Sequence, residues 1–336
     1  MKKFMNSAET LVAESLAGFV AAHERLVTFG ADRKFVRRRT LRPGKVALIS
    51  GGGAGHEPMH IGFVGQGMLD AACTGHVFTS PTPDQIVAAI DETDSGAGCL
   101  LVVKNYDGDV MNFEMAAELA ASGHRIATVT VRDDVNSGGS GRSQGRRGVA
   151  GTLVVEKLLG AAAEAGWLLD DLGALGEELN GRIRTMGVSL RGVTVPDTER
   201  QTFVLADDEM ELGVGIHGEP GRARAKFATA HEIVGTIVEE IVKDLLPGRD
   251  DRLLVFVNGF GGTPVSELYL AYNAARLHCE SLGLTVARSL VGTYVTSLDM
   301  AGLSITLARL EERELSFWDA PVDTAALRWG AHCTFP

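Results

Sequence analysis

The chain has 336 residues, of which 45% are hydrophobic and 22% are charged, and its formal net charge at pH 7 is −11. This composition is ordinary for a globular protein, and the acidic balance argues against an extended nucleic-acid-binding surface. The length allows two domains with separate hydrophobic cores. Apolar runs are too short for a membrane span, and Glu9 and Glu14 interrupt a possible signal peptide, so we expect a cytoplasmic protein. Four cysteines without CxxC spacing predict neither a metal site nor a disulfide framework.

Strand and helix patterns alternate through the first half of the chain. In chain order we expect a helix over 6–23, a strand over 46–50, a helix over 82–92, a strand over 99–103, a helix over 112–121 and a strand over 125–131. Two further helices are expected over 149–165 and 172–184. This order predicts a first α/β domain, 1–184, with a mainly parallel sheet flanked by helices.

The pattern changes near residue 185, and strands then predominate. We expect strands over 186–195, 212–216, 251–257, 285–292 and 303–309, and helices over 228–245 and 266–282. The second domain, 185–336, is therefore predicted to be a smaller α/β domain of the mixed or antiparallel α+β kind.

Two polar segments lie outside these elements. Residues 136–148 are rich in glycine, serine and arginine, which predicts a mobile surface loop. Upstream there is a basic stretch, which we interpret as a solvated face, with docking to an acidic partner as the alternative. It consists of Arg33, Lys34, Arg37, Arg38, Arg39, Arg42 and Lys45.

His217 stands in the run GVGIHGEP at 213–220, where glycines flank it closely on both sides. The backbone around the ring therefore carries little side-chain bulk, and a small molecule could approach a neutral imidazole there. A ring nitrogen of such a histidine can act as a nucleophile or as a base. A turn with a satisfied surface histidine is the alternative interpretation.

His56 has a similar setting in SGGGAGHEP at 50–58, directly after a predicted strand. The run lacks the third glycine of a dinucleotide fingerprint and the Gly-Lys-Ser/Thr end of a phosphate-binding loop. Two interpretations stay open for Gly53, Ala54 and Gly55: a loop whose N–H groups cradle a ligand, or a tight structural turn. Two histidines in glycine-rich runs, each shortly before a Glu-Pro pair, favour a single site built from distant segments.

Asp109 follows the predicted strand 99–103, near Lys104. A carboxylate there can accept the proton of a substrate alcohol, but it can equally cap the loop. Ser80, in TSPTPD at 79–84, offers a hydroxyl to a ligand or belongs to a helix start.

Taken together, these residues resemble the substrate-binding K subunits of dihydroxyacetone kinases. The resemblance runs from the first residue to about residue 330. It includes KNYDGDVMNFE (104–114), GRRGVAGTLVVEKLLGAAAE (145–164), MELGVGIHGEPG (210–221) and TSLDMAGLSITL (296–307). Several long motifs in the same order make it specific.

The resemblance implies a homodimeric glycerone kinase subunit of glycerol metabolism. His217 would bind the ketone carbon of dihydroxyacetone as a hemiaminal, and His56 and Asp109 would activate the substrate hydroxyl. Gly53, Lys104 and, more weakly, Ser80 would line the same pocket.

The resemblance also implies a partner, because the family's nucleotide domain is missing from this sequence. That domain, a separate L subunit or a fused half, holds ATP or ADP with Mg²⁺ through an aspartate-rich motif. We therefore expect this chain to bind no cofactor and to need an L subunit for phosphoryl transfer. A longer ketose such as erythrulose, and a triose-sensing role without turnover, stay open as alternatives.

Overall fold

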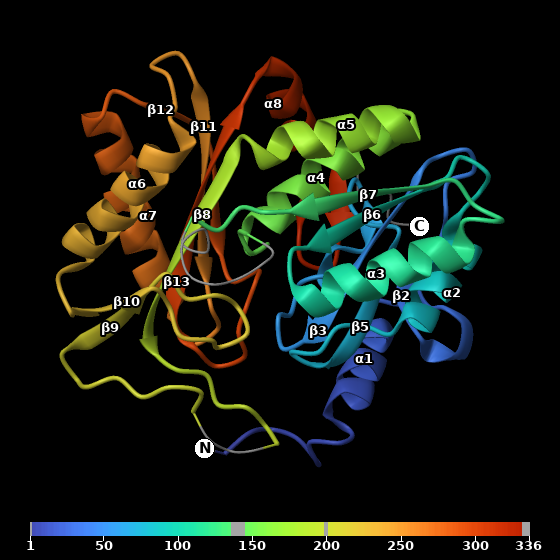
Figure 1. Cartoon of the computed structure of the whole chain (residues 1–336), viewed down its shortest axis with the longest axis horizontal. Coiled ribbons are helices and arrows are strands. Elements are labelled where there is room, and N and C mark those ends of the chain that lie inside the picture. Colours follow the sequence, from blue (N-terminus) through green and yellow to red (C-terminus); the bar gives the residue numbers. More distant parts are fainter. Residues whose placement is uncertain (1, 136–144, 198–200, 331–336) are drawn as a thin grey trace. The chain divides into compact units, whose positions relative to one another are not determined.

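The computed structural model describes residues 2–135, 145–197 and 201–330, and the chain forms two compact units (Figure 1). The first unit contains residues 5–131, 153–178 and 313–330 of those described, and the second contains 2–4, 132–135, 145–152, 179–197 and 201–312. The sequence predicted one boundary near residue 184, whereas the units interleave along the chain. The residues after 131 join the second unit because Val135 N–H donates to Thr185 O, a long-range pairing that no local pattern reveals. Among the described residues, no helix is both long and apolar enough to cross a membrane.

A six-stranded sheet forms the first unit, in the order β1-β2-β5-β3-β6-β7. The strands are β1 (Val27–Phe29), β2 (Val36–Arg38), β3 (Ala47–Ala54), β5 (Ala71–Val77), β6 (Cys99–Lys104) and β7 (Ile126–Val131). β5, β3, β6 and β7 run parallel, while β1 and β2 pair antiparallel at one edge. The predicted mainly parallel sheet is confirmed.

Helices flank this sheet. They are α1 (Leu11–Ala22), α2 (Pro83–Thr93), α3 (Asp107–Ala120), α4 (Gly151–Glu164), α5 (Leu169–Asn180) and α8 (Glu312–Asp319). Ile86 and Ile90 of α2 and Phe113 of α3 pack with apolar strand residues in one buried cluster. A small sheet of β4 (Gly65–Gln66), β14 (Val322–Thr324) and β15 (Arg328–Trp329) completes the unit, with short 3-10 turns at Ala31–Arg33 and Ile61–Phe63.

The second unit is built on a mixed sheet in the order β10-β9-β8-β13-β11-β12. Its strands are β8 (Ile183–Arg191), β9 (Glu209–Leu212), β10 (Ala223–Lys226), β11 (Arg252–Gly259), β12 (Thr285–Gly292) and β13 (Ala301–Leu310). Only β11 and β12 pair in parallel among the strand pairs described here, so the predicted mixed or antiparallel sheet is confirmed. The predicted strand over 212–216 is wrong: β9 ends at Leu212, and the next residues form a loop.

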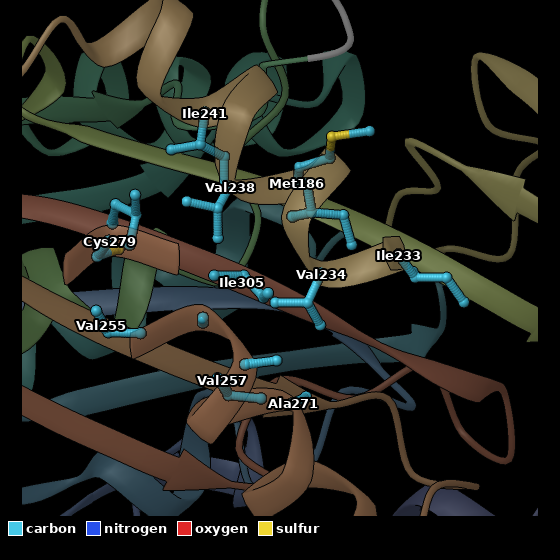
Figure 2. Close-up of a cluster of buried hydrophobic side chains, with 14 of the residues drawn as sticks. Met186, Ile233, Val234, Val238, Ile241, Val255, Val257, Ala271, Cys279 and Ile305 are labelled. Carbon is cyan, nitrogen blue, oxygen red and sulfur yellow. The ribbon is translucent and has the colours of Figure 1, made fainter. Parts of the chain in front are cut away.

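Two helices, α6 (Ala230–Leu245) and α7 (Val265–Ser281), bury their apolar sides in the core of the second unit. Val234, Val238 and Ile241 of α6 gather with Cys279 of α7 and Ile305 of β13 (Figure 2). α6 begins at a capping box, in which Thr229 Oγ1 accepts from Glu232 N–H and the Glu232 carboxylate accepts from Thr229 N–H. The helix start is therefore encoded locally, and the helix matches the predicted 228–245 within two residues at its start.

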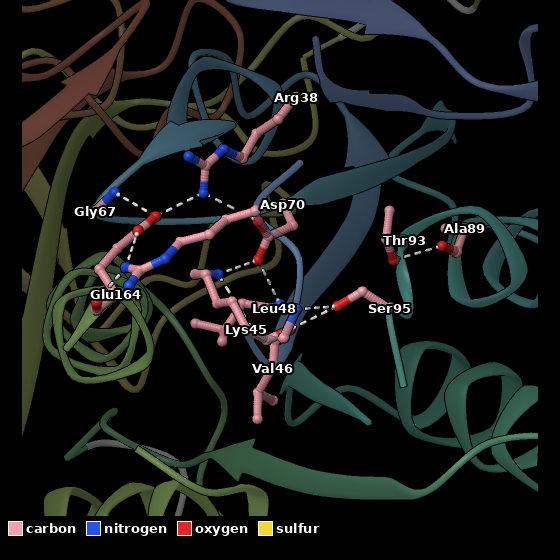
Figure 3. Close-up of polar contacts among 12 residues, drawn as sticks. Arg38, Lys45, Val46, Leu48, Gly67, Asp70, Ala89, Thr93, Ser95 and Glu164 are labelled. Carbon is pink, nitrogen blue, oxygen red and sulfur yellow. Dashed lines mark hydrogen bonds and ion pairs between the residues drawn. The ribbon is translucent and has the colours of Figure 1, made fainter. Parts of the chain in front are cut away.

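Part of the basic stretch lies inside the first unit. Arg38 and Lys45 are buried, and both contact the carboxylate of Asp70, while Arg38 also reaches Glu164 of α4 at 2.6 Å (Figure 3). The same carboxylate accepts a hydrogen bond from Leu48 N–H at 2.8 Å. The solvated-face interpretation is therefore wrong for Arg38 and Lys45, because buried carboxylates require cations nearby.

Candidate functional site

His217 lies in the loop after β9 and is half-buried. Its backbone N–H donates to Glu219 Oε2 at 2.8 Å, so the glutamate fixes the turn that carries the ring. The upstream motif is built alike, because Gly55 N–H donates to Glu57 Oε2 at 2.9 Å. In both motifs the glutamate caps the backbone two residues before it.

Arg147 of the second unit anchors the His217 loop. Its guanidinium donates to Glu219 Oε1 at 2.9 Å, to Gly213 O at 2.8 Å and to Asp134 Oδ2 at 2.6 Å. A Cβ at Gly215 would lie 1.9 Å from Glu219 Oε1, so a larger residue there would displace the glutamate from its contact with Arg147. The sequence missed this role, because Arg147 lies at the end of the predicted mobile loop 136–148. Residues 136–144 lie outside the described residues, but Arg147 is buried.

The glycine run of the first unit is a strand end and not a loop. Gly51, Gly52, Gly53 and Ala54 belong to β3 and pair in parallel with β5. A Cβ at Gly51 would lie 2.6 Å from Cys73 O, and one at Gly52 would overlap Lys104 Nζ. Glycines are therefore needed here for the close approach of a neighbouring strand and of the Lys104 side chain.

Lys104 and Asp109 form a buried ion pair, with Lys104 Nζ 3.1 Å from Asp109 Oδ2. Lys104 ends β6, and Asp109 lies in the first turn of α3, which begins five residues before the predicted 112. Carboxylates are favourable in the first turn of a helix, where the N–H groups leave positive charge. The structure thus brings together two of the predicted site residues.

His56 and Ser80 lie in the same unit. The His56 ring is buried and stacks on Phe78, with the ring centroids 5.3 Å apart. A Cβ at Gly108 would lie 2.8 Å from Ser80 Oγ, which places the serine hydroxyl against the backbone next to Asp109. Ser80 also precedes α2, whose capping box at Thr82 matches the helix-start interpretation.

A buried polar cluster behind the glycine strand was not predicted. His60 Nδ1 lies 2.6 Å from Glu156 Oε1 of α4, and His60 Nε2 lies 3.1 Å from Lys104 Nζ. Burial is the main reason that the pKa of Glu156 is raised to about 8 and that the pKa of His60 is well below its ordinary value. The sequence signal was the acidic residue Glu156 directly after the apolar run 153–155 of the predicted helix 149–165.

Glu156→Gln should change how stability depends on pH. Because the pKa of Glu156 is about 8 in the folded chain against 4.5 in the unfolded chain, the folded state binds more protons between these values, and its stability falls as pH rises. The lowered pKa of His60 acts oppositely, but only below its ordinary value of 6.5. Between about pH 6.5 and 8 the wild type should lose roughly 1 to 2 kcal/mol of unfolding free energy relative to the variant. Urea titrations of both proteins at pH 6.5 and at pH 8 measure these unfolding free energies. An equal change between the two pH values in wild type and variant would contradict the prediction.

The described residues contain no group of three or more histidine, cysteine or carboxylate side chains arranged to hold a metal ion. The side chains assembled in the first unit are a buried cation, a carboxylate and imidazoles beside a strand of glycines. Such a set can hydrogen-bond a small polyhydroxylated molecule and accept its proton.

The chain is thus a protein of two α/β units, with a histidine loop on the second and a buried Lys-Asp pair on the first. Comparison with known proteins makes this specific: the Dak1 domain model matches residues 17–326. The chain belongs to the Dak1 domain family.

The similar proteins include kinase subunits that the chain matches over their whole length. The chain is 46% identical to the PEP-dependent dihydroxyacetone kinase, dihydroxyacetone-binding subunit DhaK, of Escherichia coli K12, over 98% of this chain and 100% of the relative. It is 48% identical to the corresponding subunit of PTS-dependent dihydroxyacetone kinase 1 of Listeria innocua, over 97% of this chain and 100% of the relative.

Two further similarities bear on substrate and role. A D-erythrulose kinase of Mycolicibacterium smegmatis is 39% identical over 98% of this chain, which spans 57% of that protein. The solved structure of the dihydroxyacetone kinase operon co-activator Dha-DhaQ matches with a TM-score of 0.89 at 34% identity, over 93% of this chain and 97% of that one.

Proposed function

We propose that this chain is the substrate-binding subunit of a dihydroxyacetone kinase, which holds the ketose covalently on His217 while a nucleotide-binding L subunit phosphorylates it. The full-length similarity to dihydroxyacetone-binding subunits carries the proposal. The half-buried ring on a loop anchored by Arg147 and Glu219 supports it, since a nucleophile must be both reachable and held in place.

Capture begins when a ring nitrogen of neutral His217 adds to the carbonyl carbon. A C–N bond forms, the carbonyl π electrons move to oxygen, and the proton from the other ring nitrogen is transferred to that oxygen. The product is a hemiaminal, and no other reactant is consumed. Because glycerol has no carbonyl group, this chemistry selects ketoses over polyols.

Phosphoryl transfer then uses a terminal hydroxyl of the captured ketose. Asp109 accepts the hydroxyl proton while the oxygen attacks the transferred phosphoryl group and the bond to the nucleotide leaving group breaks. His56 would assist this activation, and Gly53 and Lys104 would bind the substrate beside it. The nucleotide and its Mg²⁺ would be held by the L subunit.

The relatives also support a separate partner chain. Their names specify dihydroxyacetone-binding subunits of PEP- or PTS-dependent kinases, which supports a separate phosphoryl-donating chain for this protein too. A homodimer of this chain is part of the same proposal.

Carbon NMR tests the covalent step. Dihydroxyacetone labelled with ¹³C at the carbonyl should lose its ketone resonance on binding and gain one of a tetrahedral carbon. His217→Ala should form no adduct. His231→Ala removes an exposed histidine from the same unit and should behave as wild type. Retention of the ketone resonance by the bound ligand would exclude the hemiaminal.

Two alternative functions are each favoured by one observation. The erythrulose kinase similarity favours a longer ketose, and the co-activator structure favours a triose sensor without turnover. Measurements of kcat/KM for dihydroxyacetone and for erythrulose, with a supplied L subunit, decide which ketose is the preferred substrate. Adduct formation without any turnover in the presence of that L subunit would identify a sensor.

A further inference from the structure

A chain of hydrogen bonds runs through the buried interior of the first unit, from α4 to the start of α3. Glu156 contacts His60, His60 contacts Lys104, and Lys104 contacts Asp109. All four side chains are at most 4% exposed. Burying four ionisable groups is costly unless each meets a complementary partner, so the donors and acceptors in this chain can be assigned.

Lys104 fixes one end of the assignment. Its ammonium has three N–H donors and no acceptor. In the described part of the chain these donors meet Gly51 O at 3.0 Å, His60 Nε2 at 3.1 Å and Asp109 Oδ2 at 3.1 Å. Each neighbour must therefore accept. His60 Nε2 can accept only when it carries no proton.

Ser50 and Glu156 fix the other end. Ser50 Oγ donates its proton to Val102 O at 2.7 Å, so toward His60 Nδ1, at 3.1 Å, it can only accept. Glu156 Oε1 lies on the same ring nitrogen at 2.6 Å. His60 is therefore the neutral tautomer with its proton on Nδ1, and Glu156 holds that proton in place.

The charge balance agrees with this assignment. The Lys104 cation is matched by the Asp109 carboxylate, and the lowered pKa of His60 and the raised pKa of Glu156 keep both of those groups neutral near pH 7. Glu156 Oε2 makes no hydrogen bond to the described residues, a loss that costs less for a neutral carboxyl than for a charged one.

We propose that Glu156 and His60 are positioning residues, which hold the Lys104 ammonium in the orientation that aims Asp109 at the substrate hydroxyl. This inference rests on the proposed function of Asp109 as the base. Without Glu156, the imidazole can adopt the other tautomer and turn an N–H toward Lys104. Two donors would then face each other, and Lys104 would move away from Asp109.

The test compares Glu156→Leu with Glu156→Gln, using the whole chain and a supplied L subunit. Leucine removes the closer of the two acceptors on His60 Nδ1 and leaves only Ser50 Oγ, which weakens the preference for a proton on Nδ1. We expect kcat to fall by about 10- to 100-fold, because small misplacements of catalytic groups cost this much. The His217 adduct should still form, since addition to the imidazole takes place in the second unit. Glutamine keeps an acceptor oxygen and should recover most of kcat.

Nitrogen NMR of ¹⁵N-histidine-labelled protein supplies a readout that a merely structural role would not move. His60 should carry its proton on Nδ1 in the wild type and in Glu156→Gln, and should lose this preference in Glu156→Leu. Glu164→Leu is the matched control, since Glu164 lies on the same helix about 12 Å farther along and contacts Arg38 instead. It should lower stability without changing kcat or the His60 tautomer.

The outcomes separate this inference from the proposed function. If the wild type forms no adduct and turns over no ketose, the proposed function fails. If the wild type is active but Glu156→Leu keeps full kcat, or changes kcat no more than Glu164→Leu does, the positioning role is overturned. An Nε2–H tautomer of His60 in the wild type would overturn it as well.

Discussion

Asp109→Asn should lower kcat for phosphoryl transfer by about 10²- to 10⁴-fold, the usual contribution of a positioned general base. The amide cannot accept the proton of the substrate hydroxyl, although it keeps the shape of the carboxylate. Capture of the ketose should persist, because the hemiaminal forms on His217. We therefore expect kcat to fall while the carbonyl-labelled adduct is still seen by NMR.

Asp107→Asn is the matched control for this prediction. Asp107 and Asp109 both lie in the first turn of α3, but Asp107 is exposed whereas Asp109 is buried against Lys104. The Asp107 variant should keep normal kcat. The adduct signal, recorded on the same sample as the kinetics, establishes that the Asp109 variant is folded. Wild-type turnover by Asp109→Asn would remove the general-base role.

The sequence predicted the elements that local patterns encode. The strands ending at Lys104 and Val131 and the helix over Ala230–Leu245 were expected within a few residues, since each combines strong periodicity with a local start or stop signal. The glycines that were expected in a loop form the end of β3 instead. They pair with β5, and this pairing between distant segments cannot be inferred from the local sequence. Long-range pairing overrode turn chemistry there.

The contacts of the candidate site were predictable only between residues that are close together in the sequence. Asp109 and Lys104 are five residues apart, so their contact follows from a strand leading directly into a helix. Glu156 is 96 residues from His60, and its partner could not be inferred without the fold. Arg147 was misassigned for a related reason: its polar neighbours dominate the local composition, while its own carboxylate partners Asp134 and Glu219 lie on separate segments.

Lys104→Met should destabilise the chain by about 3 to 5 kcal/mol, the usual effect of removing one partner of a buried ion pair. Lys104 is fully buried and Asp109 is 2% exposed, so the remaining carboxylate would stay in the interior without its cation. The variant also removes the donors to Gly51 O and His60 Nε2. Urea unfolding at pH 7 measures the loss, and phosphoryl transfer should fall with it because Asp109 loses its orienting partner.

The double variant Lys104→Met/Asp109→Asn makes the cause explicit. In the wild-type background Asp109→Asn leaves the buried lysine without a counter-charge and should destabilise the chain. In the Lys104→Met background the same change removes an uncompensated carboxylate and should stabilise it. The sign of the Asp109→Asn effect therefore reverses between the two backgrounds, which a double-mutant cycle detects. Equal effects in both backgrounds would mean that the two side chains do not interact, and the orientation of Asp109 by Lys104 would have to be abandoned.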